Sequence, residues 1–586
     1  MLDHNSSAYG TTTQRVLAIP EILELVFSFL DASGKSRCAC VCKQWSEVAL
    51  DALWRDVDSL RRLFGLLAPI ESPPAPEDSN RFVRPIEPSD WSRFMRYARR
   101  IRTLSVLPAD DERIRGALVF DEVARTRTTF NILPKLSTLI WTSELGERLR
   151  SSLMFMHENV KHFVVKLVPS DYPLSVYFQE IPLRMPKLTS LDLRFTFPVR
   201  NIEASLCDLL AALPELQKIV LPKFTYSAKI MERLSTIPAI RVIQFEYLES
   251  QGSGDASDVH NWFPVLQEGA FPSLVDLSVS VHLPHMVRFL NAEFAPVNLQ
   301  CLYVHVLYIV PPYQLYEFFD SVARILPNLT QLHVDFVGDP SPLMFRTRLS
   351  DDDRVDLSTL RPLFKLSKLK ELVINWDAPL ALRQSDIEEL ASSLSSLEIL
   401  FLGNEPIPCP QAPPLTLRAL IPFAQHCPNL RELGLYLDAS TADLDEASRE
   451  LRALLPPTRF RNLKKLQFGL SRIAEPEPVA LFLSQLCPPG CAVDAGVSWC
   501  GGFSALQAQS PEDAQVLVDM WGQASDWYPC WKEVNHMLPL LTKVRMEESA
   551  RRRELEREVE DLRIRCRLYE ERVDAGIPRD GGCIAL

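Results

Sequence analysis

The sequence lacks the features of a membrane-spanning, secreted or nucleic-acid-binding protein. No uninterrupted apolar run reaches the roughly 18 residues of a membrane helix. The first sixteen residues are polar, so we expect no secretory signal. Positive charge is scarce, because 63 Lys and Arg stand against 75 Asp and Glu, a formal net charge of −12. Such a chain is poorly suited to a phosphate backbone, and we expect no nucleic-acid partner.

Motifs for catalysis and cofactor binding are also missing. Residues 252–254 are too short for a phosphate-binding glycine loop and lack its flanking strand and helix. Cys487, Cys491 and Cys500 have no fourth metal ligand, and His282 and His285 have no nearby set to complete a site. The ten histidines are dispersed, with no legible nucleophile–base pair. We therefore expect no intrinsic catalysis, no metal and no cofactor.

The composition that remains is that of a globular intracellular chain. Of its 586 residues, 47% are hydrophobic and 24% are charged. This length exceeds that of one ordinary domain, unless the chain is a repeat array. The 13 cysteines are scattered and odd in number, which indicates reduced thiols.

The segment 17–54 spaces apolar residues as a helix does, over a span too short for a large core. Two such runs flank a polar turn at Ser33 and Gly34. Their members are Ile19, Ile22, Leu23, Val26, Phe27 and Leu30, then Val41, Trp45, Val48 and Ala49. A unit of about 40 residues buries little surface alone. We expect it to present an apolar face to another protein.

This segment resembles the F-box, the helical motif that docks onto a Skp-type adaptor in SCF ubiquitin ligases. The resemblance lies in Glu-Ile-Leu at 21–23, Val-Phe at 26–27, Val-Cys-Lys at 41–43, Trp45 and Leu-Trp at 53–54. It implies adaptor contacts through Ile19, Pro20, Glu21, Ile22, Leu23, Val26, Phe27, Leu30, Val41, Cys42, Trp45, Leu53 and Trp54.

From about residue 100, a short leucine pattern recurs. Thirteen copies start between residues 101 and 463, so the twelve intervals average about 30 residues, as in leucine-rich repeats. The copies start at Ile101, Leu136, Val160, Leu188, Leu216, Ile240, Leu274, Leu299, Leu329, Leu369, Leu397, Leu430 and Leu463. The last apolar positions of each copy alternate as in a strand, and helix-like stretches follow. We predict a stacked solenoid with a parallel sheet on its concave side; a non-repetitive α/β domain is the alternative.

Strand residues that alternate with the buried positions should line the concave side. Their mixed charge and aromatic content suit a protein surface, although solvated strand residues are the simpler explanation for any one of them. The candidate substrate contacts are Asp192, Arg194, Glu246, Tyr303, His305, His333, Asp335 and Tyr436. Two insertions, 249–261 and 338–356, are either disordered or used for binding.

The C-terminal region carries further signals. Trp499, Trp521, Trp527 and Trp531 should cap the last apolar layer. A charged helix should follow, with a seam of fewer than three heptads, so self-association through it is left open. The final four residues resemble a prenylation box, with Cys583 as the acceptor.

The predicted fold class is α/β, and the chain divides into seven segments. They are a disordered N-terminus (1–14), an F-box (15–62), a linker and helical lead-in (63–98), an irregular leucine-rich-repeat solenoid (99–500), a cap (501–531), a charged helix (532–574) and a flexible tail (575–586).

The combination resembles the F-box/leucine-rich-repeat class of SCF substrate receptors. It implies a Skp-type adaptor, a cullin–RING ligase reached through that adaptor, and an unknown protein substrate held by the repeats. The alternative is a scaffold that binds the adaptor without ubiquitin transfer. We expect a cytoplasmic and/or nuclear protein that meets a membrane only if Cys583 is prenylated.

Overall fold

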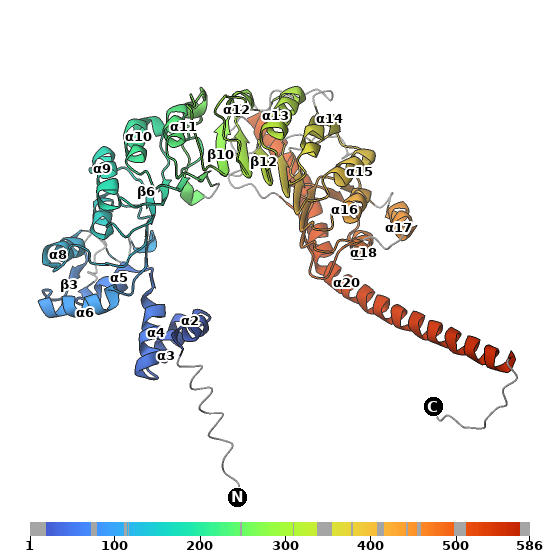
Figure 1. Cartoon of the computed structure of the whole chain (residues 1–586), viewed down its shortest axis with the longest axis horizontal. Helices are drawn as coiled ribbons and strands as arrows, with labels where there is room; N and C mark the ends of the chain where they lie inside the picture. The colour runs from blue at the N-terminus through green and yellow to red at the C-terminus, as the bar shows by residue number, and fades with distance from the viewer. Residues whose placement is uncertain are drawn as a thin grey trace, which may run out of the picture. The chain divides into compact units, whose positions relative to one another are not determined.

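The computed structural model describes residues 19–574 except 72–78, 111–113, 115–116, 247–248, 309, 337–353, 377–378, 407–414, 441–443, 454–458 and 497–510. The chain divides into two compact units (Figure 1). Unit 1 comprises Met1–Tyr308 with Arg324–Leu326, and unit 2 comprises Ile309–Ala323 with Pro327–Leu586.

Unit 1 begins with three helices, α2 (Pro20–Ser28), α3 (Ala32–Cys38) and α4 (Lys43–Trp54). Pro20 opens α2, where its missing N–H costs no hydrogen bond. The polar turn expected at Ser33 and Gly34 lies inside α3 instead. The cause is Asp31, whose carboxylate accepts from the Gly34 N–H at 2.7 Å and starts the helix early.

A short lead-in connects these helices to the repeats. It contains β1 (Asp56–Val57), α5 (Leu60–Phe64), the antiparallel pair β2 (Ile70–Glu71) and β3 (Arg81–Phe82), and α6 (Pro88–Ala98). Strand β1 pairs in parallel with the first predicted repeat strand, Val57 opposite Leu104. The sheet therefore starts within the segment assigned to the F-box.

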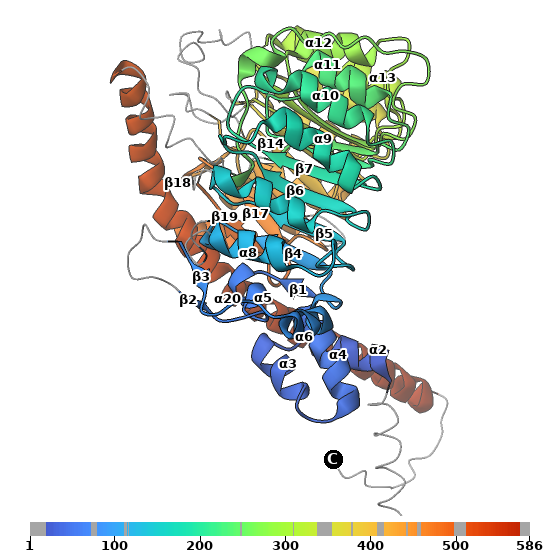
Figure 2. The same cartoon turned by 90° about the vertical axis from the view of Figure 1, so that its left-hand side faces the viewer.

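The repeats of unit 1 form a parallel sheet, part of which is seen in Figure 2. Its further strands are β4 (Thr103–Val106), β5 (Thr138–Trp141), β6 (His162–Lys166), β7 (Ser190–Arg194), β8 (Lys218–Val220), β9 (Val242–Gln244), β10 (Asp276–Val281) and β11 (Cys301–Val306). One buried column runs through the register: Val57, Leu104, Leu139, Phe163, Leu191, Ile219, Ile243, Leu277 and Leu302.

Unit 2 repeats the arrangement. Its strands are β12 (Gln331–Asp335), β13 (Glu371–Asn375), β14 (Ile399–Leu402), β15 (Glu432–Leu435), β17 (Lys465–Gln467) and β19 (Ala492–Asp494), with a small parallel pair β16 (Asp438–Ala439) and β18 (Arg472–Ile473). Its buried column is Leu332, Leu372, Leu400, Leu433, Leu466 and Val493. The repeat prediction is confirmed, and β19 adds a copy that the leucine pattern did not include.

Helices return the chain from one strand to the next, and α9, α10 and α11 lie along one side of their strands (Figure 1). The helices are α8 (Leu118–Thr126), α9 (Leu174–Arg184), α10 (Glu203–Ala211), α11 (Ala228–Ser235), α12 (Leu283–Leu290), α13 (Pro312–Ile325), α14 (Leu357–Leu360), α15 (Gln384–Ser393), α16 (Leu420–His426), α17 (Leu444–Ala453) and α18 (Pro476–Leu486). Short 3₁₀ turns lie at Gly146–Arg148, Arg150–Phe155, Val199–Asn201, Glu249–Gln251, Ala256–Val259, Arg361–Lys365 and Leu417–Ala419. None of the described helices has both the length and the apolar character needed to cross a bilayer.

Helix α20 (Pro511–Asp574) closes unit 2. It begins well before residue 532, so the predicted cap and the predicted charged helix are parts of one helix. Trp531 is 2% exposed, its ring centroid lies 4.5 Å from that of Phe468, and its indole N–H donates to the Ser471 carbonyl at 2.9 Å. Trp531 thus covers the apolar layer beside β17. Further along the same helix, Asn535 Oδ1 accepts from the backbone N–H of Val493 in β19, the last strand, at 2.8 Å. Trp499 and the Trp521 side chain lie outside the described residues.

The first prediction concerns this cap. Replacing Trp531 with alanine should lower the free energy of unfolding by about 3–5 kcal/mol, because a buried ring and its hydrogen bond are lost. Urea unfolding of the full chain, followed by circular dichroism, measures the change. Tyr528→Ala is the matched control, since Tyr528 lies in the same helix but is half exposed, and it should change the value by less than about 0.5 kcal/mol. Equal midpoints for both variants would contradict the capping role.

Candidate functional site

The three N-terminal helices share a small core. It contains Leu23 and Phe27 from α2 with Val48 and Ala49 from α4, all buried. The partly buried Trp45 packs edge-on against Phe27, with ring centroids 5.6 Å apart. This core fixes the direction of α2, and hence the direction of the side chains on its outer surface.

The outer surface of α2 is also apolar. Phe29, just after the helix, is 82% exposed, and Leu25 is 62% exposed. Val26 and Ile19 are exposed as well, and Val41 is exposed before α4. Helix α2 thus has apolar residues on two sides, and its own domain covers only the inner side. An uncovered apolar side of this kind is typical of an interaction surface.

The structure divides the thirteen predicted adaptor contacts into two groups. Leu23, Phe27 and Trp54 are buried within the chain, so they stabilise the domain and are not available to a partner. This corrects their assignment as adaptor contacts. The others are exposed or partly exposed: Ile19, Pro20, Glu21, Ile22, Val26, Leu30, Val41, Cys42, Trp45 and Leu53. Leu25 and Phe29 were missed, although their spacing of four residues places them on one side of a helix.

Trp54 joins α4 to the lead-in. Its ring centroid lies 5.0 Å from that of Tyr97 in α6. The guanidinium carbon of Arg62 lies 4.5 Å from the centroid of the Trp54 ring. The same guanidinium donates to the Leu53 carbonyl at 2.9 Å. Trp54, the last residue of the F-box pattern, therefore packs inside unit 1 and connects α4 to α5 and α6.

Arg100 makes a second connection to α4. Its guanidinium pairs with the carboxylates of Glu47 and Asp51 and donates to the Glu47 carbonyl at 3.0 Å. Burial acts to lower the pKa of Arg100, but its hydrogen bonds with the two carboxylates outweigh burial and raise the pKa above the ordinary value. The Arg100 guanidinium thus stays charged at physiological pH.

A polar cleft of about 490 Å³ lies beside this connection. Six basic residues line it, Lys35, Arg55, Arg99, Arg100, Arg102 and Lys135, against three acidic ones, Glu24, Asp51 and Asp56. This local positive charge contrasts with the acidic balance of the whole chain.

The strand residues predicted to line the array are only partly available. Arg194, Glu246, Tyr303 and His333 are partly exposed. Asp192, His305, Asp335 and Tyr436 are buried, which corrects their assignment to a substrate surface. The reasons differ from residue to residue.

Asp192 is covered by the first insertion. The Gln251 side chain is fully buried, and its Nε2 donates to Asp192 Oδ1 at 3.2 Å and to the Leu193 carbonyl at 3.1 Å. The Arg194 guanidinium donates to the other carboxylate oxygen at 2.9 Å. Gly252 lies so close to strand β7 that a Cβ would be 2.0 Å from the Phe195 carbonyl oxygen, at a φ of +84°.

The rest of the insertion is also docked. The Arg200 guanidinium pairs with Asp255 at 2.6 Å and with Asp258 at 2.7 Å. Hydrogen bonds from the Ser257 backbone N–H and from Arg200 lower the pKa of Asp255 to about 2. Residues 249–261, for which disorder and binding were both considered, therefore pack as an ordered strap on the array.

The other three buried residues lie in different local settings. His305 lies against the Phe224 ring, with centroids 5.5 Å apart, and burial followed by the charge of Lys223 lowers its pKa to about 3, so it is neutral. Asp335 ends β12 in register with Asn375. Tyr436 follows the last residue of β15, where the alternation of strand side chains no longer applies.

The described residues contain no group of His, Cys, Asp and Glu side chains arranged to hold a metal ion. His260, His282 and His285 do meet, with His282 stacked on Tyr308 at 4.7 Å. Burial, then the neighbouring His260 and His285, lower the pKa of His282 to about 4.

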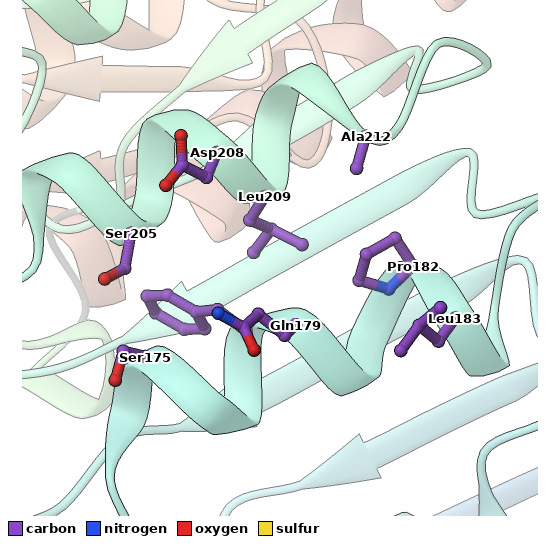
Figure 3. Close-up of a pocket in the computed structure, with 9 residues that line it drawn as sticks. Ser175, Gln179, Pro182, Leu183, Ser205, Asp208, Leu209 and Ala212 are labelled. Atoms are coloured by element: carbon purple, nitrogen blue, oxygen red, sulfur yellow. The ribbon is translucent and has the colours of Figure 1, made fainter.

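An open groove of about 350 Å³ lies between α9 and α10 (Figure 3). Pro182 and Leu183 line it from α9, and Leu209 and Asp208 line it from α10. Its mixed lining holds no set of catalytic groups.

Residues 20–59 match the F-box-like family model, a range that includes α2, α3, α4 and β1. A solved structure described as "Crystal structure of TLR13-ssRNA13 complex" matches at 15% identity and a TM-score of 0.28, over 67% of this chain and 54% of that one. This chain thus aligns with about half of that protein. No curated protein matches the sequence. The chain combines an N-terminal F-box-like domain with a parallel array of leucine-rich strand–helix repeats.

Proposed function

We propose that this protein is the substrate-recognition subunit of an SCF-type E3 ubiquitin ligase. F-box domains generally bind Skp-type adaptors, and the observation that supports this role here is the exposed apolar side of α2. The adaptor would connect the chain to a cullin–RING ligase. The repeats would hold a protein substrate near the ubiquitin-loaded enzyme and raise its effective concentration, with no catalytic group of their own.

Adaptor binding should depend on the exposed residues of α2. Phe29→Asp should weaken the affinity for a purified Skp-type adaptor at least tenfold, because a charge would be placed where an apolar side chain must be desolvated. Isothermal titration calorimetry measures the affinity, and circular dichroism shows that the variant is folded. Leu23 is unsuitable for this test, since it is part of the domain core.

The matched control is Val83→Asp. Val83 is 62% exposed in unit 1 but lies outside the family match, so its substitution should leave adaptor affinity unchanged. Wild-type affinity in Phe29→Asp would remove α2 from the docking surface.

Ubiquitin transfer distinguishes the receptor from a scaffold that binds the adaptor alone. We expect proximity labelling in cells to mark the same substrate with the wild-type chain and with Phe29→Asp. That substrate should accumulate only in cells that carry the variant, because the ligase is no longer recruited. Labelled proteins whose abundance never changes, together with no cullin in the purified complex, would favour the scaffold.

Prenylation of Cys583 is a separate proposal, on a residue outside the described part of the chain. Expression in a eukaryotic cell should attach one geranylgeranyl group to the Cys583 sulfur as a thioether, since a terminal leucine favours this isoprenoid. Mass spectrometry of the C-terminal peptide identifies the thioether. Cys583→Ser should abolish it, whereas Cys566→Ser should keep it. An unmodified wild-type chain would leave the protein without this membrane anchor.

A further inference from the structure

The last part of α20 carries apolar side chains that the rest of the described chain does not cover. Every residue from Arg551 to Glu571 is exposed, and this part of the helix extends away from α18 in Figure 1. Upstream, by contrast, Val534 and Leu538 are buried against the end of unit 2. A lone helix with an apolar stripe is marginal in water and is stabilised by a partner that covers the stripe.

The spacing of the stripe is that of a coiled coil. The steps from Leu555 to Val559, Leu562, Cys566 and Tyr569 are four, three, four and three residues. In heptad notation, Val559 and Cys566 take position a, and the other three take position d. One heptad earlier, position a is Arg552, so the apolar seam begins at Leu555. A β-branched residue at a with leucine at d favours two parallel strands over larger bundles.

The charged residues beside the stripe favour a second copy of the same helix. In a parallel, in-register pair, position g of one helix faces position e of the other, five residues further along. All three such pairs have opposite charges: Arg551 with Glu556, Glu558 with Arg563, and Arg565 with Glu570.

An antiparallel pair packs position a of one helix against position d of the other, and two registers bring the stripes together. With Val559 opposite Tyr569, Glu556 faces Glu570 and Arg563 faces its own counterpart, so like charges meet. With Val559 opposite Leu562, Glu556 faces Arg563, but Tyr569 then lies opposite Arg552. The parallel pair keeps all five stripe residues against apolar partners and matches the three flanking charge pairs.

We propose that residues 551–571 of α20 form a parallel, two-stranded coiled coil with a second copy of this chain. The inference goes beyond the ligase role and does not depend on it. In this arrangement the two copies of Cys566 face each other at position a, close enough for a short covalent link. The stripe is short, so the dimer should dissociate in the micromolar range.

Sedimentation equilibrium on the full chain tests the dimer. Wild type should form a reversible dimer, and Leu562→Glu should raise its dissociation constant at least tenfold, because a charge would enter the apolar seam. Ile564→Glu is the matched control: Ile564 is 49% exposed in the same turn but occupies the outer position f, so the dimer should persist. A monomeric wild type, or an unchanged dimer in Leu562→Glu, would overturn the proposal.

The orientation has its own test. A short bismaleimide added to the full chain should link Cys566 to Cys566 of the second copy, as peptide mapping would show, and Leu562→Glu should abolish the link. Glu558→Arg should weaken the dimer, and adding Arg563→Glu should restore it. A dimer without the Cys566 link, or without this rescue, would overturn the parallel arrangement.

Discussion

The array depends on one recurring backbone interaction. At the start of a strand, a single carbonyl accepts from two consecutive N–H groups of the next copy. The Lys161 carbonyl, for example, accepts from Thr189 at 2.9 Å and from Ser190 at 3.0 Å, and the Thr189 carbonyl accepts in turn from the following copy. The two donors fix the register, and the register places each leucine directly over the one before it. Because each copy contacts only its neighbours, the ends of the stack need separate cover.

The strands were predictable because each copy supplies its own local signal. The spacing of the leucines predicts that side chains such as those of Leu191 and Leu400 point into the core. This prediction does not depend on the length of the helix that follows. The signal fails at the ends, where β1 (Asp56–Val57) and β19 (Ala492–Asp494) each carry one valine and no recurring leucine pattern. It also failed at α20, whose early start carries no leucine pattern, and at α3, whose first turn depends on a single capping carboxylate, Asp31.

Exposure was harder to predict than secondary structure. The alternation along β7 correctly separates Leu191 from Arg194, but it does not reveal that Gln251, about sixty positions later, covers Asp192. The same limit applies to the F-box-like domain. Helical spacing identifies Leu23 and Phe27 as apolar but does not distinguish residues that hold three helices together from residues that face outward. Leu25 and Phe29 belong to the second class, and only the packing of α2 on α4 shows it.

Gly252 gives the strap an unusual sensitivity. A single methyl group there would collide with the Phe195 carbonyl, and a residue with a side chain would also be strained at this φ. If the strap moved away, the carboxylate of Asp192 would lose its cover and the guanidinium of Arg200 its two acidic partners. Which acidic and basic groups this part of the array exposes therefore depends on residue 252 remaining a glycine.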